Sequence, residues 1–315
     1  MQENNINYYN DNDNDNDGEI DFKELFNALW SKRILITIIT TIFAISSVIY
    51  ALYLPNIYTS TATLAVANEK SSLSSKLGSY SALAGIAGVS LPSDSSNPSP
   101  EAMERIRSFD FFTEHFLPYI NLEDLYAAKK WNPEEDSIIY DKRLFDKSKN
   151  QWVRNENPSI PSEQEAFEVY QKILSISEDK KTRFVYLSIE HFSPNIAKEW
   201  VEIVIKNINE SMRSENMKVS SKSIAFLRER AETTNIKEIR DAITQLLQSQ
   251  MQNLMLATAS ESYIYKILNS PIAPEEKSAP GRALICFFGT FIGFLLSFAL
   301  ALISNFRKKL NNEFS

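Results

Sequence analysis

The sequence ILITIITTIFAISSVIYALYL, which occupies Ile34–Leu54, is an uncharged apolar run. A helix that crosses the hydrocarbon core of a bilayer needs about 20 such residues. A buried helix of a soluble protein rarely reaches this length without a charge, and the apolar core of a cleaved signal peptide is shorter, at about 7–15 residues. We therefore predict a transmembrane helix over residues 34–54.

A second uncharged run, ALICFFGTFIGFLLSFALALI, lies near the other end of the sequence at Ala283–Ile303. Lys32 and Arg33 precede the first run, and Arg307–Lys309 follow the second. Because cytoplasmic flanks carry the excess of Lys and Arg, both termini are expected in the cytoplasm. The expected organisation is a cytoplasmic tail (1–33), a span (34–54), an external domain (55–282), a span (283–303) and a second cytoplasmic tail (304–315).

Between the two spans, the sequence predicts an α+β domain. Tyr58–Ala67 and Thr182–His191 are rich in β-branched residues, which is typical of strands. Ser162 and Glu165 have the spacing of a capping box that opens a helix through about Ile176. Ser193, followed by Pro194, has the pattern of another helix start.

A long helix is expected after Pro194, because neither proline nor glycine occurs from Asn195 to about Leu268. The stretch predicts one helix over about 195–268, or two nearly collinear helices with a weak point at 232–235. Apolar residues recur there at a spacing of three or four, as in a coiled coil: Ile224, Leu227, Ile236, Ile239, Ile243 and Leu246. A 50-residue helix would be ~75 Å long, so neighbouring copies of the chain are expected to cover this stripe. The alternative is that the stripe packs on its own domain.

Catalytic chemistry has no clear signature in this sequence. His115 and His191 lie among apolar residues without the spacing of a zinc site, and Cys286, which is the single cysteine, lies inside the second apolar run. Nucleotide-binding glycine motifs are absent from the sequence. The net charge of −7 equals the charge of residues 1–31, and the rest is balanced, which argues against nucleic-acid binding. We expect no catalytic residue, no cofactor and no enzyme activity.

One metal motif does occur, in the acidic tail. DNDNDGEIDFKE matches an EF-hand loop, with Asp13, Asp15, Asp17 and Glu24 as the ligands and Gly18 at the turn. The Asp/Asn repeat supplies Asp13, Asp15 and Asp17 through low complexity, the segment before it is a poor entering helix, and no second loop follows. We interpret the match as coincidental and expect no metal site.

The connection before the second span, NSPIAPEEKSAPGRALI, contains Pro271, Pro274, Pro280 and Gly281. Proline lacks an N–H group, so it ends a helix and stiffens the chain. An ordinary helix terminator would need only one proline. The cluster is therefore a candidate functional element.

These features together resemble the chain length determinant (Wzz-type) family of polysaccharide co-polymerases. The resemblance rests on IDFKELFNALWSKRILI (20–36), LPNIYTSTATLAV (54–66), the Pro-rich connection and the second span with its basic tail. The Ser/Ala/Gly-rich segment followed by EAMERIRSFDFF (101–112) is also similar to the family. GEIDFKELFNALW is what such proteins have before their first span, which gives Gly18–Glu24 a second explanation.

The resemblance implies a Gram-negative inner-membrane protein with a periplasmic α/β base and a protruding helix. It implies a homo-oligomeric ring that sets the length of O-antigen or a related polysaccharide, together with the integral-membrane polymerase that extends undecaprenyl-linked chains. Pro271, Pro274, Pro280 and Gly281 would form the element for polymerase contact or assembly. Only about 12 residues follow Ile303, so no kinase domain of the related exopolysaccharide proteins is expected. The alternative function is a periplasmic adaptor for polysaccharide export.

Overall fold

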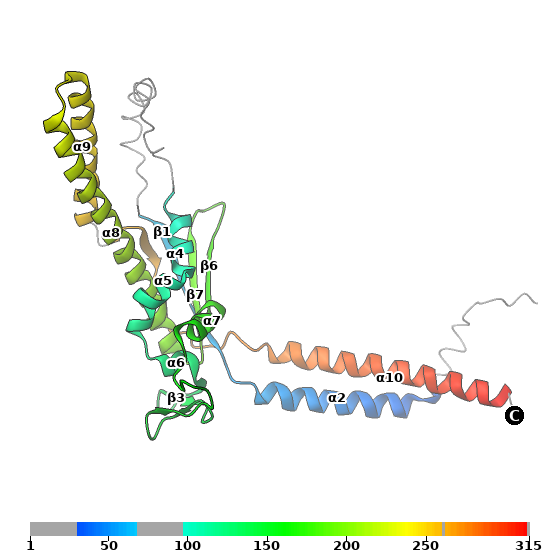
Figure 1. Ribbon diagram of the computed structural model, residues 1–315. Coiled ribbons are helices and arrows are strands. Elements are labelled where there is room, and N and C mark those ends of the chain that lie inside the picture. Colours follow the sequence, from blue (N-terminus) through cyan, green and yellow to red (C-terminus); the bar gives the residue numbers. More distant parts are fainter. Residues whose placement is uncertain (1–29, 68–96, 260–261, 314–315) are drawn as a thin grey trace, which may run out of the picture. The chain divides into compact units, whose positions relative to one another are not determined.

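The computed structural model describes residues 30–67, 97–259 and 262–313 (Figure 1). The chain divides into two compact units, Met1–Leu54 with Gly281–Ser315, and Pro55–Pro280. The first contains α2 (Arg33–Tyr53) and α10 (Arg282–Glu313). Both helices are long and apolar enough to cross a membrane, and few of their residues are buried. The predicted pair of candidate membrane helices is confirmed, although α10 continues as a helix beyond Ile303.

The second unit is built on a four-stranded antiparallel sheet of order β6-β7-β1-β8. Its strands are β1 (Tyr58–Val66), β6 (Leu174–Glu178), β7 (Val185–His191) and β8 (Tyr265–Asn269). β1 and β7 are the two central strands, with Ser60 opposite Ile189 and Ala62 opposite Leu187. They correspond to the two strands that β-branched residues predicted. β8 is the edge strand next to β1, so the last part of the unit pairs with its first strand.

Several short elements lie between β1 and β6 in the sequence. They are α4 (Ser99–Arg107), α5 (Phe109–Phe111), η1 (Phe112–Phe116), η2 (Leu117–Tyr119), α6 (Leu122–Tyr126), the hairpins β2–β3 (Ala128–Asn132 and Ser137–Tyr140) and β4–β5 (Phe145–Asp146 and Gln151–Trp152), and α7 (Glu163–Ile173). The predicted capping box opens α7: the Ser162 amide donates to Glu165 (2.8 Å), and the Glu165 amide donates to Ser162 Oγ (3.2 Å). The expected end of this helix near Ile176 is wrong, because residues from Leu174 onward pair with β7.

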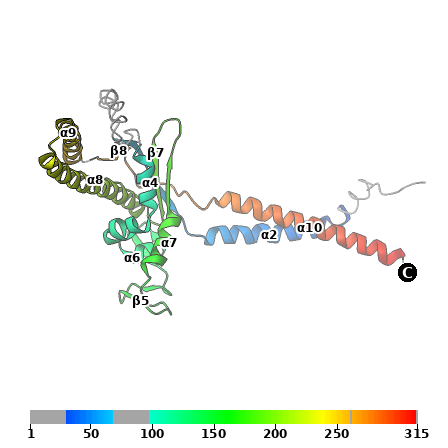
Figure 2. The ribbon, with the colours of Figure 1, turned by 45° about the horizontal axis from the view of Figure 1, so that its top comes forward.

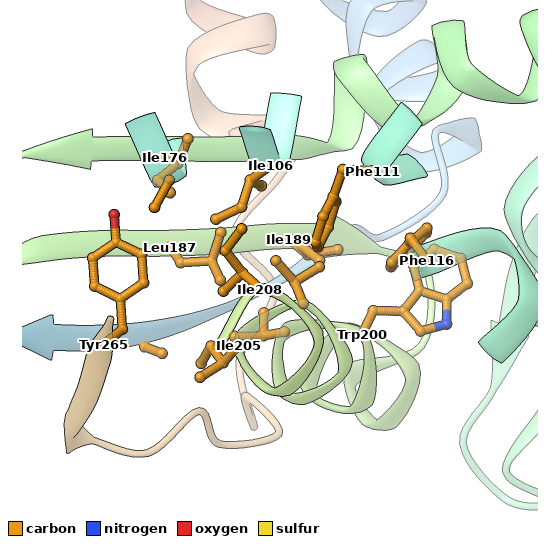
Figure 3. Packing of buried hydrophobic residues seen from close by; sticks show 14 of the residues in the cluster. Ile106, Phe111, Phe116, Ile176, Leu187, Ile189, Trp200, Ile205, Ile208 and Tyr265 are labelled. Atoms are coloured by element: carbon orange, nitrogen blue, oxygen red, sulfur yellow. The ribbon is translucent and has the colours of Figure 1, made fainter. Parts of the chain in front are cut away.

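The hydrophobic core lies between one face of the sheet and the first half of the long helix α8 (Pro194–Thr233) (Figure 3). Alternate residues of β7 face this core: Val185, Leu187 and Ile189 are fully buried. Trp200, Ile205 and Ile208 come from α8, and the other labelled side chains come from α4 to η1, β6 and β8. Burying each large apolar side chain contributes roughly 1.5–3 kcal/mol, so this cluster holds α8 firmly on the sheet.

The single or collinear helix expected over about 195–268 is wrong. The structure contains α8 and α9 (Lys237–Ala259), which fold back on each other as a helical hairpin (Figures 1 and 2). The break lies at the predicted weak point. There the Thr234 hydroxyl donates to the Arg230 carbonyl (2.8 Å), and Arg240 donates to the Thr234 carbonyl (2.7 Å). These side chains satisfy carbonyl groups that a continuing helix would have bonded with backbone amides.

Candidate functional site

The Pro-rich connection lies along the beginning of β1. The Ile57 amide donates to the Ala279 carbonyl (2.9 Å), and the Ser278 amide donates to the Ile57 carbonyl (2.9 Å), which forms an isolated antiparallel bridge. No regular strand is formed between Pro271 and Pro280. Prolines cannot donate to a ladder, so backbone pairing alone cannot hold this connection to the sheet.

Hydroxyl groups supply the remaining contacts. Thr59 Oγ1 donates to Ser278 Oγ (2.7 Å), and Ser278 Oγ donates to the Ile57 carbonyl (3.0 Å). The buried Ser60 donates from Oγ to the Ile272 carbonyl (2.8 Å). We call these residues, Ile57, Thr59, Ser60, Ile272 and Ser278, the β1 clasp. It fastens both ends of the Pro-rich connection to the residues that follow the first candidate span.

The four predicted motif residues do not converge on one point. Pro271 is buried beside the sheet, Pro274 and Pro280 are half-buried, and Gly281 is exposed. The Ala279–Pro280 peptide bond is cis. The partners of the connection, which are the hydroxyl side chains of β1, were missed by the sequence analysis. The signal was present in YTSTA (58–62), where hydroxyl residues occupy a strand that also needs buried positions.

A second feature missed from the sequence is the contact between the two candidate spans. Small residues recur at every fourth position of α10 and face α2: Gly289, Gly293, Ser297 and Ala301. A Cβ atom added to Gly289 would lie 2.4 Å from Cβ of Ser47, and one added to Gly293 would lie 2.4 Å from Cβ of Phe43. Gly-x-x-x-Gly in an apolar helix is the usual signal for close packing of this kind. The two candidate spans therefore form a tight helix pair within one chain.

Arg282 joins the ends of the same two helices. Its Nε donates to the Ala51 carbonyl (3.0 Å), and its Nη2 donates to the Leu54 carbonyl (3.4 Å). Carbonyl groups in the last turn of a helix lack intrahelical partners, and the C-terminal end carries partial negative charge. The guanidinium group at the start of α10 thus caps the end of α2.

The predicted oligomer stripe divides into two sets in the helical hairpin. Ile243 is buried between α8 and α9, and Ile224, Leu227 and Leu246 are half-buried there. Ile236 and Ile239 are exposed, with 55% and 46% of their surface accessible. Further exposed apolar residues on the hairpin are Val219, Phe226, Met251, Met255 and Leu256. The hairpin of a single chain therefore buries one part of the stripe, around Ile243, and leaves the other part, at Ile236 and Ile239, exposed to solvent.

The two histidines differ in their surroundings. His191 is buried at the end of β7, where Nδ1 accepts from the Ser193 amide (3.0 Å) and Nε2 faces the Asp124 carbonyl (3.0 Å). Burial lowers the pKa of His191. The His115 side chain is partly exposed and lies 3.9 Å from Glu114. Among the described residues, no group of three or more His, Cys, Asp or Glu could hold a metal ion. Asp13, Asp15, Asp17 and Glu24 lie outside the described residues.

Comparison with known proteins gives one family match. Residues 18–103 match the model of the chain length determinant protein family, Wzz. The resemblance inferred from the sequence is confirmed. The matched residues include all of α2 and β1 and the first half of α4. The match begins at Gly18, so it contains Glu24 but leaves Asp13–Asp17 outside.

Similar solved structures are described as polysaccharide co-polymerases. A full-length bacterial polysaccharide co-polymerase is similar at 13% identity, over 92% of this chain and 99% of that chain, with a TM-score of 0.39. A fragment of WzzB, a polysaccharide co-polymerase from Salmonella Typhimurium, is similar at 15% identity, over 71% of this chain and 100% of that chain, with a TM-score of 0.25. Among curated proteins, no match is found.

Proposed function

We propose that this chain is a non-catalytic regulator of polysaccharide chain length. It acts as a co-polymerase: it binds the integral-membrane polymerase that extends an undecaprenyl-linked polysaccharide of the O-antigen type, and it does not form glycosidic bonds itself. The observation that carries the proposal is the Wzz family match, which runs through the first candidate span and into β1. The second candidate span at the other end of the chain supports the same organisation.

The proposed location is the inner membrane of a Gram-negative bacterium, with residues 55–282 in the periplasm. Both termini would be cytoplasmic. The support is the distribution of basic residues, with Lys32 and Arg33 before α2 and Arg307–Lys309 near the end of α10. A reporter enzyme that is active only in the periplasm, fused after Ser278 or after Ser315, tests this orientation. Activity of the fusion at Ser315 would contradict it.

The proposed assembly is a closed ring of identical chains. The exposed apolar side chains on the α8–α9 hairpin support it, because this surface is more apolar than an isolated surface helix requires. Ile236 and Ile239 lie on the uncovered part of the predicted stripe and are the proposed contact residues. A neighbouring copy would remove them from water, while Ile243 stays inside its own hairpin.

The proposed polymerase contact involves the α2–α10 pair and the Pro-rich connection. Each proline removes a backbone donor and restricts the chain, and the β1 clasp holds the connection in one conformation. A preformed segment of this kind binds a partner at a smaller cost in conformational entropy than a flexible one. Pro271, Pro274, Pro280 and Gly281 are the proposed residues of this element.

The test is a comparison of surface polysaccharide from a strain that lacks the gene, the same strain with the gene restored, and the parent. Gel separation of lipopolysaccharide and capsule resolves the chain lengths. The expected result is loss of the preferred length, so that an unregulated ladder replaces it, and recovery on complementation. An unchanged ladder with polymer retained inside the cell would overturn the proposal and favour a role in export.

A further inference from the structure

The strongest additional feature of the external unit is the buried contact around His191, where three elements meet. His191 is the last residue of β7, Ser193 is the N-cap of α8, and Asp124 belongs to α6. The His191 ring bonds to the backbone of both other elements, at the Ser193 amide and the Asp124 carbonyl, each at 3.0 Å. No part of the proposed function uses this ring.

The two hydrogen bonds define the protonation state. Nδ1 accepts from the Ser193 N–H, so it carries no proton, and Nε2 therefore carries the proton and donates to Asp124. A neutral imidazole satisfies both partners, whereas a doubly protonated ring has no acceptor left for Ser193. Protonation of His191 would thus break its hydrogen bond with the Ser193 amide.

Ser193 also starts α8. Its Oγ accepts from the Ile196 amide (3.4 Å), and its carbonyl accepts from the Ala197 amide (3.1 Å). A positive charge beside this point is unfavourable, because the N-terminal end of a helix carries partial positive charge. Trp200, about two turns further along α8, packs on the His191 ring with centroids 4.8 Å apart.

The carboxylate that faces His191 favours protonation of the ring only in part. Asp124 on α6 is the nearest carboxylate and attracts a charged ring, but it is buried and already accepts from Tyr140 (2.6 Å) and Asn121 (3.0 Å). Tyr140 on β3 donates its hydroxyl hydrogen bond to the Asp124 carboxylate and not to the His191 ring. Tyr58 is the partner of His191 on β1, and α8 contributes the uncharged Trp200.

We propose that His191 is an acid-sensitive joint: its protonation releases Ser193 and opens the first turn of α8 while the rest of the external unit stays folded. Local opening exposes the ring to water, where its pKa is about 6.5. Burial lowers the pKa of His191 in the closed joint. The open form therefore binds the proton first, so the closed joint is fully stable above about pH 6.5 and loses stability as the pH falls below that value.

The test is amide hydrogen exchange of the full-length chain in nanodiscs from pH 7.5 to pH 5.0, with rates corrected for the intrinsic effect of pH. Peptides that cover residues 192–200 report the joint, and peptides from α7 report the rest of the unit. The expected result is a fall in protection over 192–200 of up to tenfold for each pH unit below about 6.5, which is the slope for uptake of one proton. Protection of α7 should not change.

The chain contains only two histidines, which gives a matched pair of variants. His191→Gln keeps a neutral polar group and should abolish the pH dependence, whereas His115→Gln should retain it. Flat protection in the wild-type chain, persistence of the effect in His191→Gln, or parallel loss in α7 would each overturn the proposal.

A second measurement covers the case in which His191→Gln does not fold. Trp30, Trp131 and Trp152 are replaced by phenylalanine, so that Trp200 is the only remaining tryptophan. A protonated imidazole quenches a neighbouring indole, so the fluorescence of Trp200 should fall only at the pH at which residues 192–200 lose their protection and the protonated open form becomes the major species. A fall in Trp200 fluorescence while residues 192–200 stay protected would contradict the proposal, because the ring would then be charged in the closed joint.

Discussion

Gly293 of α10 lies so close to Phe43 of α2 that an added Cβ atom would be 2.4 Å from Cβ of the phenylalanine. Gly289 has the same relationship with Ser47. Real Cβ atoms do not approach to this distance, so the two helices can keep their spacing only if both positions stay glycine. The backbone contact also places Thr40 Oγ1 and Ser297 Oγ 3.4 Å apart within the pair.

The first prediction concerns this helix contact. Gly289→Ala should separate α2 from α10 and lower stability by about 1–3 kcal/mol, the usual cost of overpacking. Thermal unfolding of the purified protein in detergent measures the change. Ser47→Gly should restore stability in the double variant, because it removes the clashing atom. Gly281→Ala is the control, since a Cβ atom there meets only Leu284 at ordinary distances of 3.8–4.0 Å. Equal effects at Gly289 and Gly281 would refute the packing.

The second prediction concerns Asn209, a buried amide of α8. Its Oδ1 accepts from the Ile264 and Tyr265 amides (2.8 and 2.9 Å), and its Nδ2 donates to the Ile205 and Tyr265 carbonyls (3.0 and 3.1 Å). Asn209→Leu removes the side-chain partner of the Ile264 and Tyr265 amides and of the Tyr265 carbonyl, at a cost of about 1–3 kcal/mol for each buried group left unsatisfied. β8 should lose protection from hydrogen exchange. Asn195→Ala, at an exposed position with one side-chain bond to Asp136, is the control and should have a small effect.

The third prediction concerns acid stability at the start of α7. Arg154 forms an ion pair with Glu165, and this guanidinium, together with the Ser162 amide, lowers the pKa of Glu165 to about 2 from the usual 4.5. The pair therefore stabilises the fold above about pH 4.5, and this contribution is lost as the pH falls towards 2. Glu165→Gln should be less stable than wild type at pH 7, and the difference should shrink by pH 3. Circular dichroism melting measures it, with Glu163→Gln as the control. A constant difference would exclude the ion pair as its cause.

The fourth prediction separates the two parts of the apolar stripe. Ile239→Asp alters an exposed side chain, so it should leave monomer folding nearly unchanged and weaken assembly. Ile243→Asp buries a charge inside the hairpin and should destabilise the fold by several kcal/mol. Cross-linking and light scattering in detergent report assembly, and circular dichroism reports folding. If Ile239→Asp assembles like wild type, the exposed stripe is not the contact between copies.

The fifth prediction concerns the Pro-rich connection. Pro271→Ala and Pro274→Ala should broaden or shift the distribution of polysaccharide lengths without preventing assembly, because each restores flexibility to a connection that the β1 clasp holds. Gel profiles of the complemented strains measure the lengths. Pro133→Ala, in the turn between β2 and β3, is the control and should give the parental profile. Unchanged profiles for both prolines would remove the connection from the polymerase contact.

Sequence alone was sufficient for features that depend on neighbouring residues. The length of each apolar run identified α2 and α10, because the hydrocarbon thickness sets a length that few soluble helices share. The Ser162–Glu165 spacing located the start of α7, because both hydrogen bonds of a capping box lie within one turn.

Only the tertiary structure decided where these elements meet. In the sequence, apolar residues keep their spacing of three or four on both sides of Thr234. This spacing is the same whether α9 extends α8 or reverses along it. The reversal is stabilised by contacts between distant residues: Ile243 packs between the helices, and Asn209 binds the backbone at Ile264 and Tyr265, more than 50 positions later. Likewise, Tyr265–Asn269 becomes a strand because β1 offers an open edge, which no property of those five residues reveals. Local patterns determined the elements of this protein, and long-range pairing determined their arrangement.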